Sequence, residues 1–299
     1  MDTALVRAAW QAGEIVHDLT YFAPETRAAT AALGIRGGWT SYFGCRAAPL
    51  GAVSAATVTA VFYNFAPAMV ARSIPDVWRF ATPEQLLHAR LVAVEAAMRR
   101  VFAGAAPGRD RGPAGGESTA AGFDSAAELA WRAATAADTA GRPLAAANAA
   151  QPMPAAPRLV LWQALTTLRE HRGDGHVALL VARGIGPVEA HLLAAGTGRS
   201  TAEDLRVNRR WDAGDWQAAE RSLAARGWLT ADGKLTPAGV AAREDLEDAT
   251  DELAAGPYEA LGADGTAELV GLLRPLADRI VRTGAVPVPN PVGVSWPPT

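Results

Sequence analysis

The sequence is poor in residues that build several familiar kinds of site. It has a single cysteine, Cys45, so no intramolecular disulfide can form, and this thiol lies in an apolar run typical of a buried residue. It has a single lysine, Lys234, and a net charge of −3. This balance argues against a broad basic surface for nucleic acid, although a local patch can exist within it.

Longer patterns are missing as well. No apolar run reaches the roughly 18 residues of a membrane-spanning helix, and no basic and apolar leader precedes a cleavage site. We therefore expect a cytoplasmic protein with no membrane partner. The sequence has no glycine-rich phosphate loop, no nucleophile elbow and no zinc-finger spacing. These classes of enzyme find no support, and we expect no metal and no cofactor.

The most informative stretch that is present runs from Gly214 to Gly239 and reads GDWQAAERSLAARGWLTADGKLTPAG. Asp215 is placed to cap a helix with apolar residues on one face, and Gly227 is placed to end it. Asp232-Gly233 favours a tight turn between two short extended pieces. Thr236-Pro237 then begins another helix. Helix, short hairpin and helix together form the C-terminal half of a winged helix-turn-helix.

This order of residues resembles the MarR family of winged-helix regulators, and the resemblance covers Leu161 to Val281. It implies a transcriptional regulator that binds DNA and responds to a small ligand. It also implies the fold class, which is mainly α: tandem helical and winged-helix domains in one chain, with a short β-hairpin wing in the C-terminal half.

Breaks in the pattern divide the rest of the chain. Pro67 is expected to kink or end an apolar helix, and Thr82-Pro83-Glu84 to begin a long helix that runs to Phe102. Residues 104–124 are rich in Gly, Pro and Ala and predict a linker. We predict four regions: a degenerate helical, winged-helix-like domain (1–103), the linker (104–124), a MarR-like winged helix-turn-helix domain (125–285) and a proline-rich tail (286–299).

Landmarks in the two halves follow the same order. Ala23-Pro24 and Ala156-Pro157 each open a helix, and an offset of 137 residues sets Trp39 against His176. Chance similarity between alanine-rich helices is the alternative. The shared order favours an internal duplication, which would place a pseudo-dimer within one chain and make the first half a degenerate copy.

The predicted recognition helix, Asp215 to Arg226, offers a poor set of side chains for reading bases. From Arg169 to Arg226, nine arginines oppose eight acidic residues. DNA is therefore expected as a weak partner, bound mostly by charge. A solvated helix face explains the same arginines at least as well. The candidate DNA-binding residues are Arg206, Arg209, Arg210, Gln217 and Arg221.

Aromatic and polar residues together predict a pocket for a small molecule. Trp39, Tyr42 and Arg46 are spaced by three and four residues, so they share one helix face. A ligand with an apolar or aromatic body and an anionic group would satisfy both the rings and Arg46. The alternative is that Trp39 and Tyr42 are core residues. The predicted ligand-binding residues are Trp39, Tyr42, Arg46, Tyr63, Asn64 and His176.

The densest polar cluster contains the candidate catalytic residues His171, Asp174 and His176. A histidine with a carboxylate suits acid–base chemistry, and Asp174 is expected to orient His176. The alternative is a helix C-terminal cap with a turn at Asp174-Gly175. Whether any reaction is catalysed stays open. A second hypothesis for function follows: a winged-helix scaffold repurposed as a small-molecule-binding protein or biosynthetic enzyme with no DNA role.

Overall fold

The structure, a computed structural model, describes residues 1–103, 119–198, 200–290, 292–293 and 295–298. Within these residues the regular secondary structure is helical, and the expectation of a mainly α protein is confirmed. No single helix in this part of the chain is long and apolar enough to cross a membrane. The helices are α1 (Thr3–His17), α2 (Leu19–Phe22), α3 (Pro24–Ala32), α4 (Gly38–Ala47), α5 (Ala55–Phe62), α6 (Pro67–Ala71), α7 (Pro83–Phe102), α8 (Thr119–Thr135), α9 (Pro143–Ala149), α10 (Pro157–Ala182), α11 (Pro187–Ala195), α12 (Ala202–Arg209), α13 (Ala213–Ala225), α14 (Pro237–Ala254), α15 (Gly256–Glu259) and α16 (Gly262–Arg282), with short 3-10 turns at Ala48–Leu50 and Asp76–Arg79.

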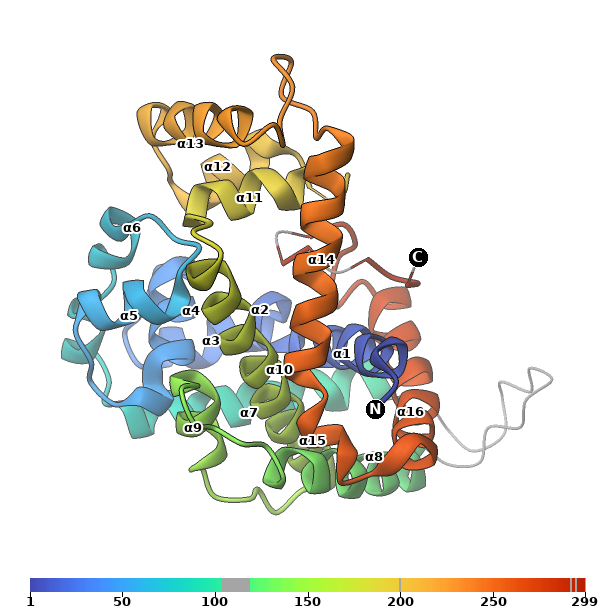
Figure 1. The fold of residues 1–299 in the computed structure, drawn as a ribbon. Coiled ribbons are helices and arrows are strands. Elements are labelled where there is room, and N and C mark those ends of the chain that lie inside the picture. The colour runs from blue at the N-terminus through green and yellow to red at the C-terminus, as the bar shows by residue number, and fades with distance from the viewer. Residues whose placement is uncertain (104–118, 199, 291, 294, 299) are drawn as a thin grey trace.

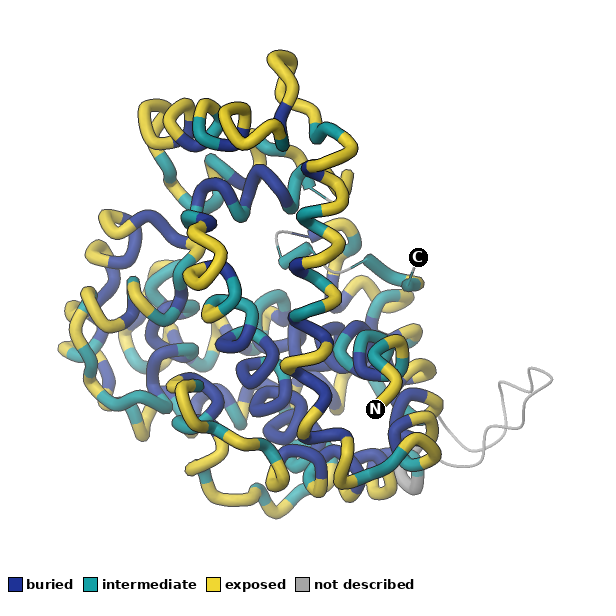
Figure 2. The backbone as a smooth tube through the Cα atoms, in the orientation of Figure 1, coloured by how far each residue is buried: buried dark blue, intermediate teal, exposed yellow. Residues whose placement is uncertain are grey.

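Helix α10 is the axis of the molecule. It packs against α1, α8, α9 and α14, and Figure 1 shows α10 and α14 rising together to carry α11, α12 and α13. Its N-terminal part enters the largest core, where Leu161 and Trp162 are fully buried. Burying an aromatic side chain of this size contributes about 2–3 kcal/mol. Figure 2 shows the buried residues gathered where α10 meets α1, and exposed residues along α13 and the turn after it.

The alternative of a helix C-terminal cap with a turn at Asp174-Gly175 is wrong, because α10 continues through these residues to Ala182. The two glycines there do not end the helix. At Gly175 a Cβ atom would lie 2.5 Å from Nη1 of Arg142, so this glycine faces a close side-chain contact inside the helix rather than a turn. As a result, Glu170 and His176 project from one continuous helix.

The N-terminal segments α3 to α7 surround a second core, rich in aromatic residues. The predicted helix to Phe102 is confirmed: Thr82 and Gln85 form a capping box at its start. Pro67 begins a new short helix, as a break at that position predicts. The proposed repeat aligns Trp39 with His176. The two residues occupy different positions in their helices, because Trp39 lies at the start of α4 and His176 lies within the long helix α10. The pseudo-dimer within one chain stays a prediction.

Helices α11, α12 and α13 enclose a third core around Leu193, Trp216 and Leu223. The N-cap of α13 is Asp212, whose side chain accepts the backbone N–H of Asp215, so the predicted cap at Asp215 is wrong by three residues. Arg210, between α12 and α13, has a left-handed backbone with φ of 56°.

The predicted β-hairpin wing is wrong, and with it the tandem winged-helix fold class. Leu229 and Leu235 form a single antiparallel bridge, and no strand forms in the described residues around it. The hydroxyl of Thr230 accepts the backbone N–H of Lys234, and Thr236 is already used as the N-cap of α14. Beside this bridge, the backbone N–H of Thr230 donates to the carbonyl of Lys234 and that of Thr236 to the carbonyl of Trp228, but Thr236 already begins α14 as its N-cap, so the pairing extends no further.

The predicted linker is only partly described. Residues 104–118 lie outside the described residues, and α8 begins at Thr119. The largest core contains residues from both sides of this segment, including Met98 and Ala126. The tail from Pro287 folds back on the body, where the Trp296 indole donates to Asp278 over 2.8 Å.

Candidate functional site

A cavity of about 650 Å³ lies where the N-terminal helices, α10 and the α11–α12 pair meet, and we name it the large cavity. Its volume lies in the range of small-molecule sites. Five of the six predicted ligand-binding residues line it: Trp39, Tyr42, Arg46, Asn64 and His176. Tyr63 is not on its lining. Its hydroxyl instead donates to the carbonyl of Ile185 over 2.6 Å.

One wall of the large cavity is aromatic. The rings of Trp39 and Tyr42 meet edge to face at 5.6 Å, and Phe65 lies 5.5 Å from Tyr42. Phe43 is fully buried behind them and stacks on Phe62. Trp39 and Tyr42 remain only partly buried, so their rings form a surface for an apolar ligand as well as an extension of the core.

Each of the three guanidinium nitrogens of Arg46 donates a hydrogen bond to a protein group. Its Nε and Nη2 donate to Glu170 over 3.0 and 2.9 Å, its Nη1 donates to the Tyr42 hydroxyl over 3.1 Å, and its guanidinium lies 4.2 Å from the centre of the Phe62 ring. Burial opposes the charge on Arg46, yet the neighbouring Glu170 raises its pKa above the ordinary value. Burial alone would raise the pKa of Glu170, but Arg46 and Arg169 hold it well below its usual range.

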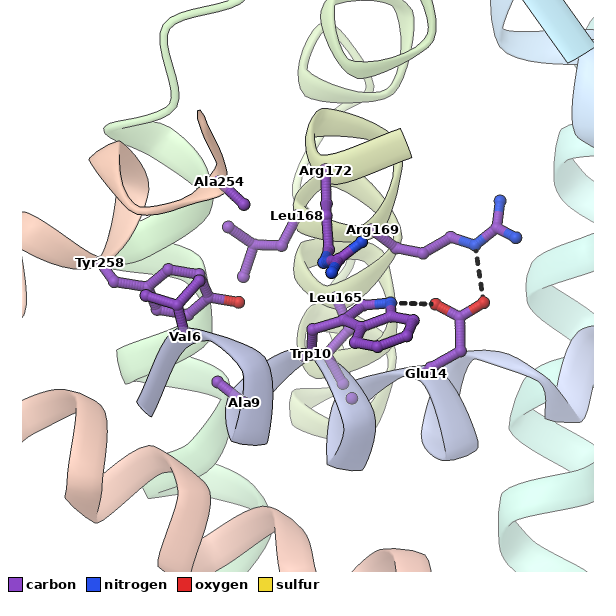
Figure 3. A pocket seen from close by; sticks show the side chains of 11 residues that line it. Val6, Ala9, Trp10, Glu14, Leu165, Leu168, Arg169, Arg172, Ala254 and Tyr258 are labelled. Carbon is purple, nitrogen blue, oxygen red and sulfur yellow. Dashed lines mark hydrogen bonds and ion pairs between the residues drawn. The ribbon is translucent and has the colours of Figure 1, made fainter. Parts of the chain in front are cut away.

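Arg169 extends this network toward α1. Its Nε donates to Glu14 and its Nη1 to Glu170, each over 2.9 Å. Figure 3 shows the indole of Trp10 and the guanidinium of Arg169 both reaching the Glu14 carboxylate. These residues also border a small cavity of about 10 Å³, which has room for about one water molecule. Trp10, Glu14 and Arg169 therefore form a wall between the small and large cavities.

The large cavity carries an excess of positive charge. Its lining contains seven arginines and three glutamates. Arg90 is 5% exposed and lies 4.9 Å from the Trp162 ring, and its Nε has no hydrogen-bond partner in the described part of the chain. Burial lowers the pKa of this guanidinium. The charged residues on the lining are Arg27, Arg46, Arg90, Arg169, Arg172, Arg209, Arg243, Glu14, Glu170 and Glu247.

The three candidate catalytic residues are not brought together. His176 lines the large cavity, and its Nδ1 lies 2.9 Å from the hydroxyl of Thr250. Asp174 instead accepts the backbone N–H of Ala145, and burial raises its pKa to about 6. The carbonyl of His171 accepts from Arg142, and His171 is not on the cavity lining. The expectation that Asp174 orients His176 is wrong, because Thr250 holds that position.

The candidate DNA-binding residues lie in different settings. Arg206 is paired with Glu203 over 2.8 Å, and Arg209 lines the large cavity with its guanidinium 4.6 Å from the centre of the Phe65 ring. Arg210, Gln217 and Arg221 are exposed. On the outer face of α12 and α13, these three therefore lie beside the paired Arg206, whereas Arg209 does not.

Sequence reasoning missed several residues of the large cavity. Glu170 and Arg169 both project from α10 into the site, and no pattern in the sequence marks either of them as a cavity residue. His17 and Tyr21 also line the cavity, and their spacing of four residues is the signal that the sequence offers for them. The structure joins them, with His17 Nε2 3.0 Å from the Tyr21 hydroxyl.

Comparison with known proteins gives one finding. A family model described as a helix-turn-helix family matches residues 6–287. Neither the curated proteins nor the solved structures contain a match to this chain.

Proposed function

Since the chain belongs to the helix-turn-helix family, we propose that it is a ligand-responsive regulator of MarR-like type whose small-molecule ligand occupies the large cavity. Membership of the family supports DNA binding in general. The observation that carries the ligand-responsive part is the large cavity itself, with its aromatic wall and its excess of arginine.

The ligand is an anion with an apolar or aromatic body. The aromatic wall suits a flat apolar body, and seven arginines against three glutamates leave the cavity positive. Arg46 is not the residue that meets the anion, because Glu170 and Tyr42 already use its donors. Arg209 lies on the lining beside Phe65, where the aromatic wall would hold the apolar body, and is the arginine assigned to the anion in this proposal.

We expect ligand binding to affect the positions of α11 and α12 through the segment from Tyr63 to Ala66. The carbonyl of Asn64 accepts from both His191 and Trp211, and the N–H of Ala66 donates to the carbonyl of Arg209. Asn64 and Phe65 also line the large cavity. A ligand there touches the same short segment that holds α11 and α12, which is the contact a regulatory coupling requires.

DNA binding is proposed to be weak and mostly electrostatic. From Ala202 to Ala225, five acidic residues oppose four arginines. One of those arginines is paired with Glu203 and another lines the large cavity. Arg210 and Arg221 are left to meet phosphates, and Asp215 lies in the first turn of α13, where a phosphate would approach.

The excess of acidic residues from Ala202 to Ala225 favours a second candidate function. In it, the chain is a small-molecule-binding protein or biosynthetic enzyme that uses the helix-turn-helix scaffold without a DNA role. The placement of Arg209 beside Phe65 supports this candidate, because a residue suited to phosphate contact is used in the cavity instead.

Calorimetric titration with 2-naphthoate and with its neutral amide, 2-naphthamide, tests the ligand. We expect the carboxylate to bind at least tenfold more tightly, since a charge-assisted hydrogen bond contributes about 1.5–3 kcal/mol. Equal affinities, or no binding of either, would contradict the proposed anion. Titration of genomic DNA fragments at several salt concentrations separates the two candidate functions: regulators bind with a steep salt dependence, whereas the second candidate predicts no binding.

A further inference from the structure

Two histidines on the lining of the large cavity are held in the same way by the neighbouring helix. His17 Nδ1 lies 3.0 Å from the hydroxyl of Thr166, and His176 Nδ1 lies 2.9 Å from the hydroxyl of Thr250. Each threonine hydroxyl donates its only proton to a carbonyl four residues earlier in its own helix, over 2.8 Å at Trp162 and 2.6 Å at Leu246.

This arrangement fixes the tautomer of both rings. Because each hydroxyl proton is already donated to a carbonyl, the threonine oxygen can only accept from the histidine. Nδ1 therefore carries the ring proton in His17 and in His176. Burial lowers the pKa of His176 to about 4 and that of His17 well below its ordinary value, so both rings are neutral near pH 7. Nε2 of each ring is then a bare hydrogen-bond acceptor.

The Nε2 atoms of His17 and His176 differ in their hydrogen-bond partners. At His17, the Tyr21 hydroxyl lies 3.0 Å from Nε2 and must donate to it. At His176, Nε2 has no hydrogen-bond partner among the residues that the structure describes, and the ring lines the large cavity. A phenol from the protein itself thus occupies one acceptor, while the matching acceptor belongs to a ring that lines the space proposed for the ligand.

We propose that His176 Nε2 accepts a hydrogen bond from a hydroxyl group of the ligand, which makes the ligand a hydroxylated aromatic acid. The Tyr21 phenol on His17 is the internal example of this contact. The inference rests on the proposed function, because it assigns one more group to the ligand of the same cavity. Thr250 is a positioning residue, since it acts through His176 and not on the ligand.

The isomeric hydroxy-2-naphthoates, each beside its methyl ether, test this inference by calorimetry. A methyl ether cannot donate to Nε2, so the best hydroxy isomer should bind about three- to tenfold more tightly than its ether. His176→Phe should abolish this preference, so that each hydroxy isomer and its methyl ether bind the variant with the same affinity. Thr250→Ser should keep the preference, and Thr250→Val should reduce it.

The failures are distinguishable. If no naphthoate binds the wild-type protein, both the proposed function and this inference are overturned. If the naphthoates bind but no hydroxy isomer is preferred, or His176→Phe keeps the preference, this inference alone is overturned. Histidine nitrogen NMR of the ligand-free protein adds a test without any probe. A proton on Nδ1 of His176 near pH 7 supports the inference, and a proton on Nε2 overturns it.

Discussion

The large cavity and the outer face of α12 and α13 are neighbours, yet they use charge differently. In the cavity wall, Glu170 is 1% exposed and is satisfied by Arg46 and Arg169. On the outer face, Glu203 and Arg206 form an exposed i,i+3 pair of the kind that contributes little to stability. Buried charges are costly, so their arrangement is informative, whereas a solvated helix face tolerates almost any polar residue.

The largest expected effect comes from breaking the buried network. Glu170→Gln should lower the free energy of unfolding by about 3–5 kcal/mol, because Arg46 and Arg169 would lose their charge partner in a buried site. Urea denaturation measures this change. The matched substitution on the outer face, Glu203→Gln, should leave the urea midpoint unchanged. Similar losses for both variants would contradict the contrast between the two regions.

Acid should destabilise the fold between about pH 6.5 and pH 4. Burial lowers the pKa of His171, His176 and His191 to about 4, and that of His17 well below its ordinary value. The unfolded chain takes up these protons near pH 6.5, so stability is lost as pH falls through this window. Two carboxyls, Asp18 and Asp174, act in the opposite direction because burial raises their pKa.

The three histidines with a pKa of about 4, less Asp174 with a pKa of about 6, leave a net of about two groups. They predict a slope of about 3 kcal/mol per pH unit, since each group contributes about 1.4 kcal/mol per unit. Urea unfolding at several pH values measures the slope. A flat profile between pH 6.5 and pH 4.5 would show that the histidines are not held neutral.

Removing part of the aromatic wall should weaken ligand binding more than stability. Trp39→Ala should reduce the affinity for 2-naphthoate about tenfold, because the ring loses the contact surface shared with Tyr42 and Phe65. Trp228, which lies beside Arg226 and is not on the lining of the large cavity, is the matched control. Trp228→Ala should leave this affinity unchanged in the same calorimetric titration. An equal loss in both variants would argue against the aromatic wall as the ligand surface.

The smallest effect is expected on the outer face. Arg210→Ala with Arg221→Ala should reduce any affinity for DNA and make the dependence on salt shallower by about two phosphate contacts. Fluorescence anisotropy with genomic DNA fragments measures both quantities. Sequence-selective binding at physiological salt that survives the double substitution would show that other residues read the DNA.

Local signals in the sequence predicted local structure well. Thr82, Pro83 and Gln85 predict the start of α7, and the structure confirms it with a capping box. The β-hairpin wing failed because a turn signal at Asp232-Gly233 does not supply the paired backbone that a strand needs. Gly173 and Gly175 do not mark an end of α10, because a helix tolerates glycine in its interior when its packing against other helices holds it, which no local pattern reveals.

The site was predictable in its aromatic part and not in its charged part. Trp39, Tyr42 and Arg46 share a helix face by spacing alone, and all three line the large cavity. The partner of Arg46 is Glu170, 124 residues away, so its donors could not be recognised as already used. In the same way, the sequence alone indicates a surface arginine at Arg209. The fold places its guanidinium over the ring of Phe65, which is distant in the sequence.

Two adjacent arginines allow the most direct test of the claim that the large cavity is the ligand site. Arg209 lines it, and Arg210 is exposed on the outer face. In calorimetric titration with 2-naphthoate, Arg209→Met should reduce the affinity at least tenfold, and Arg210→Met should leave it unchanged. Equal affinities for the two variants, whether both reduced or both unchanged, would contradict the assignment of the anion to the large cavity.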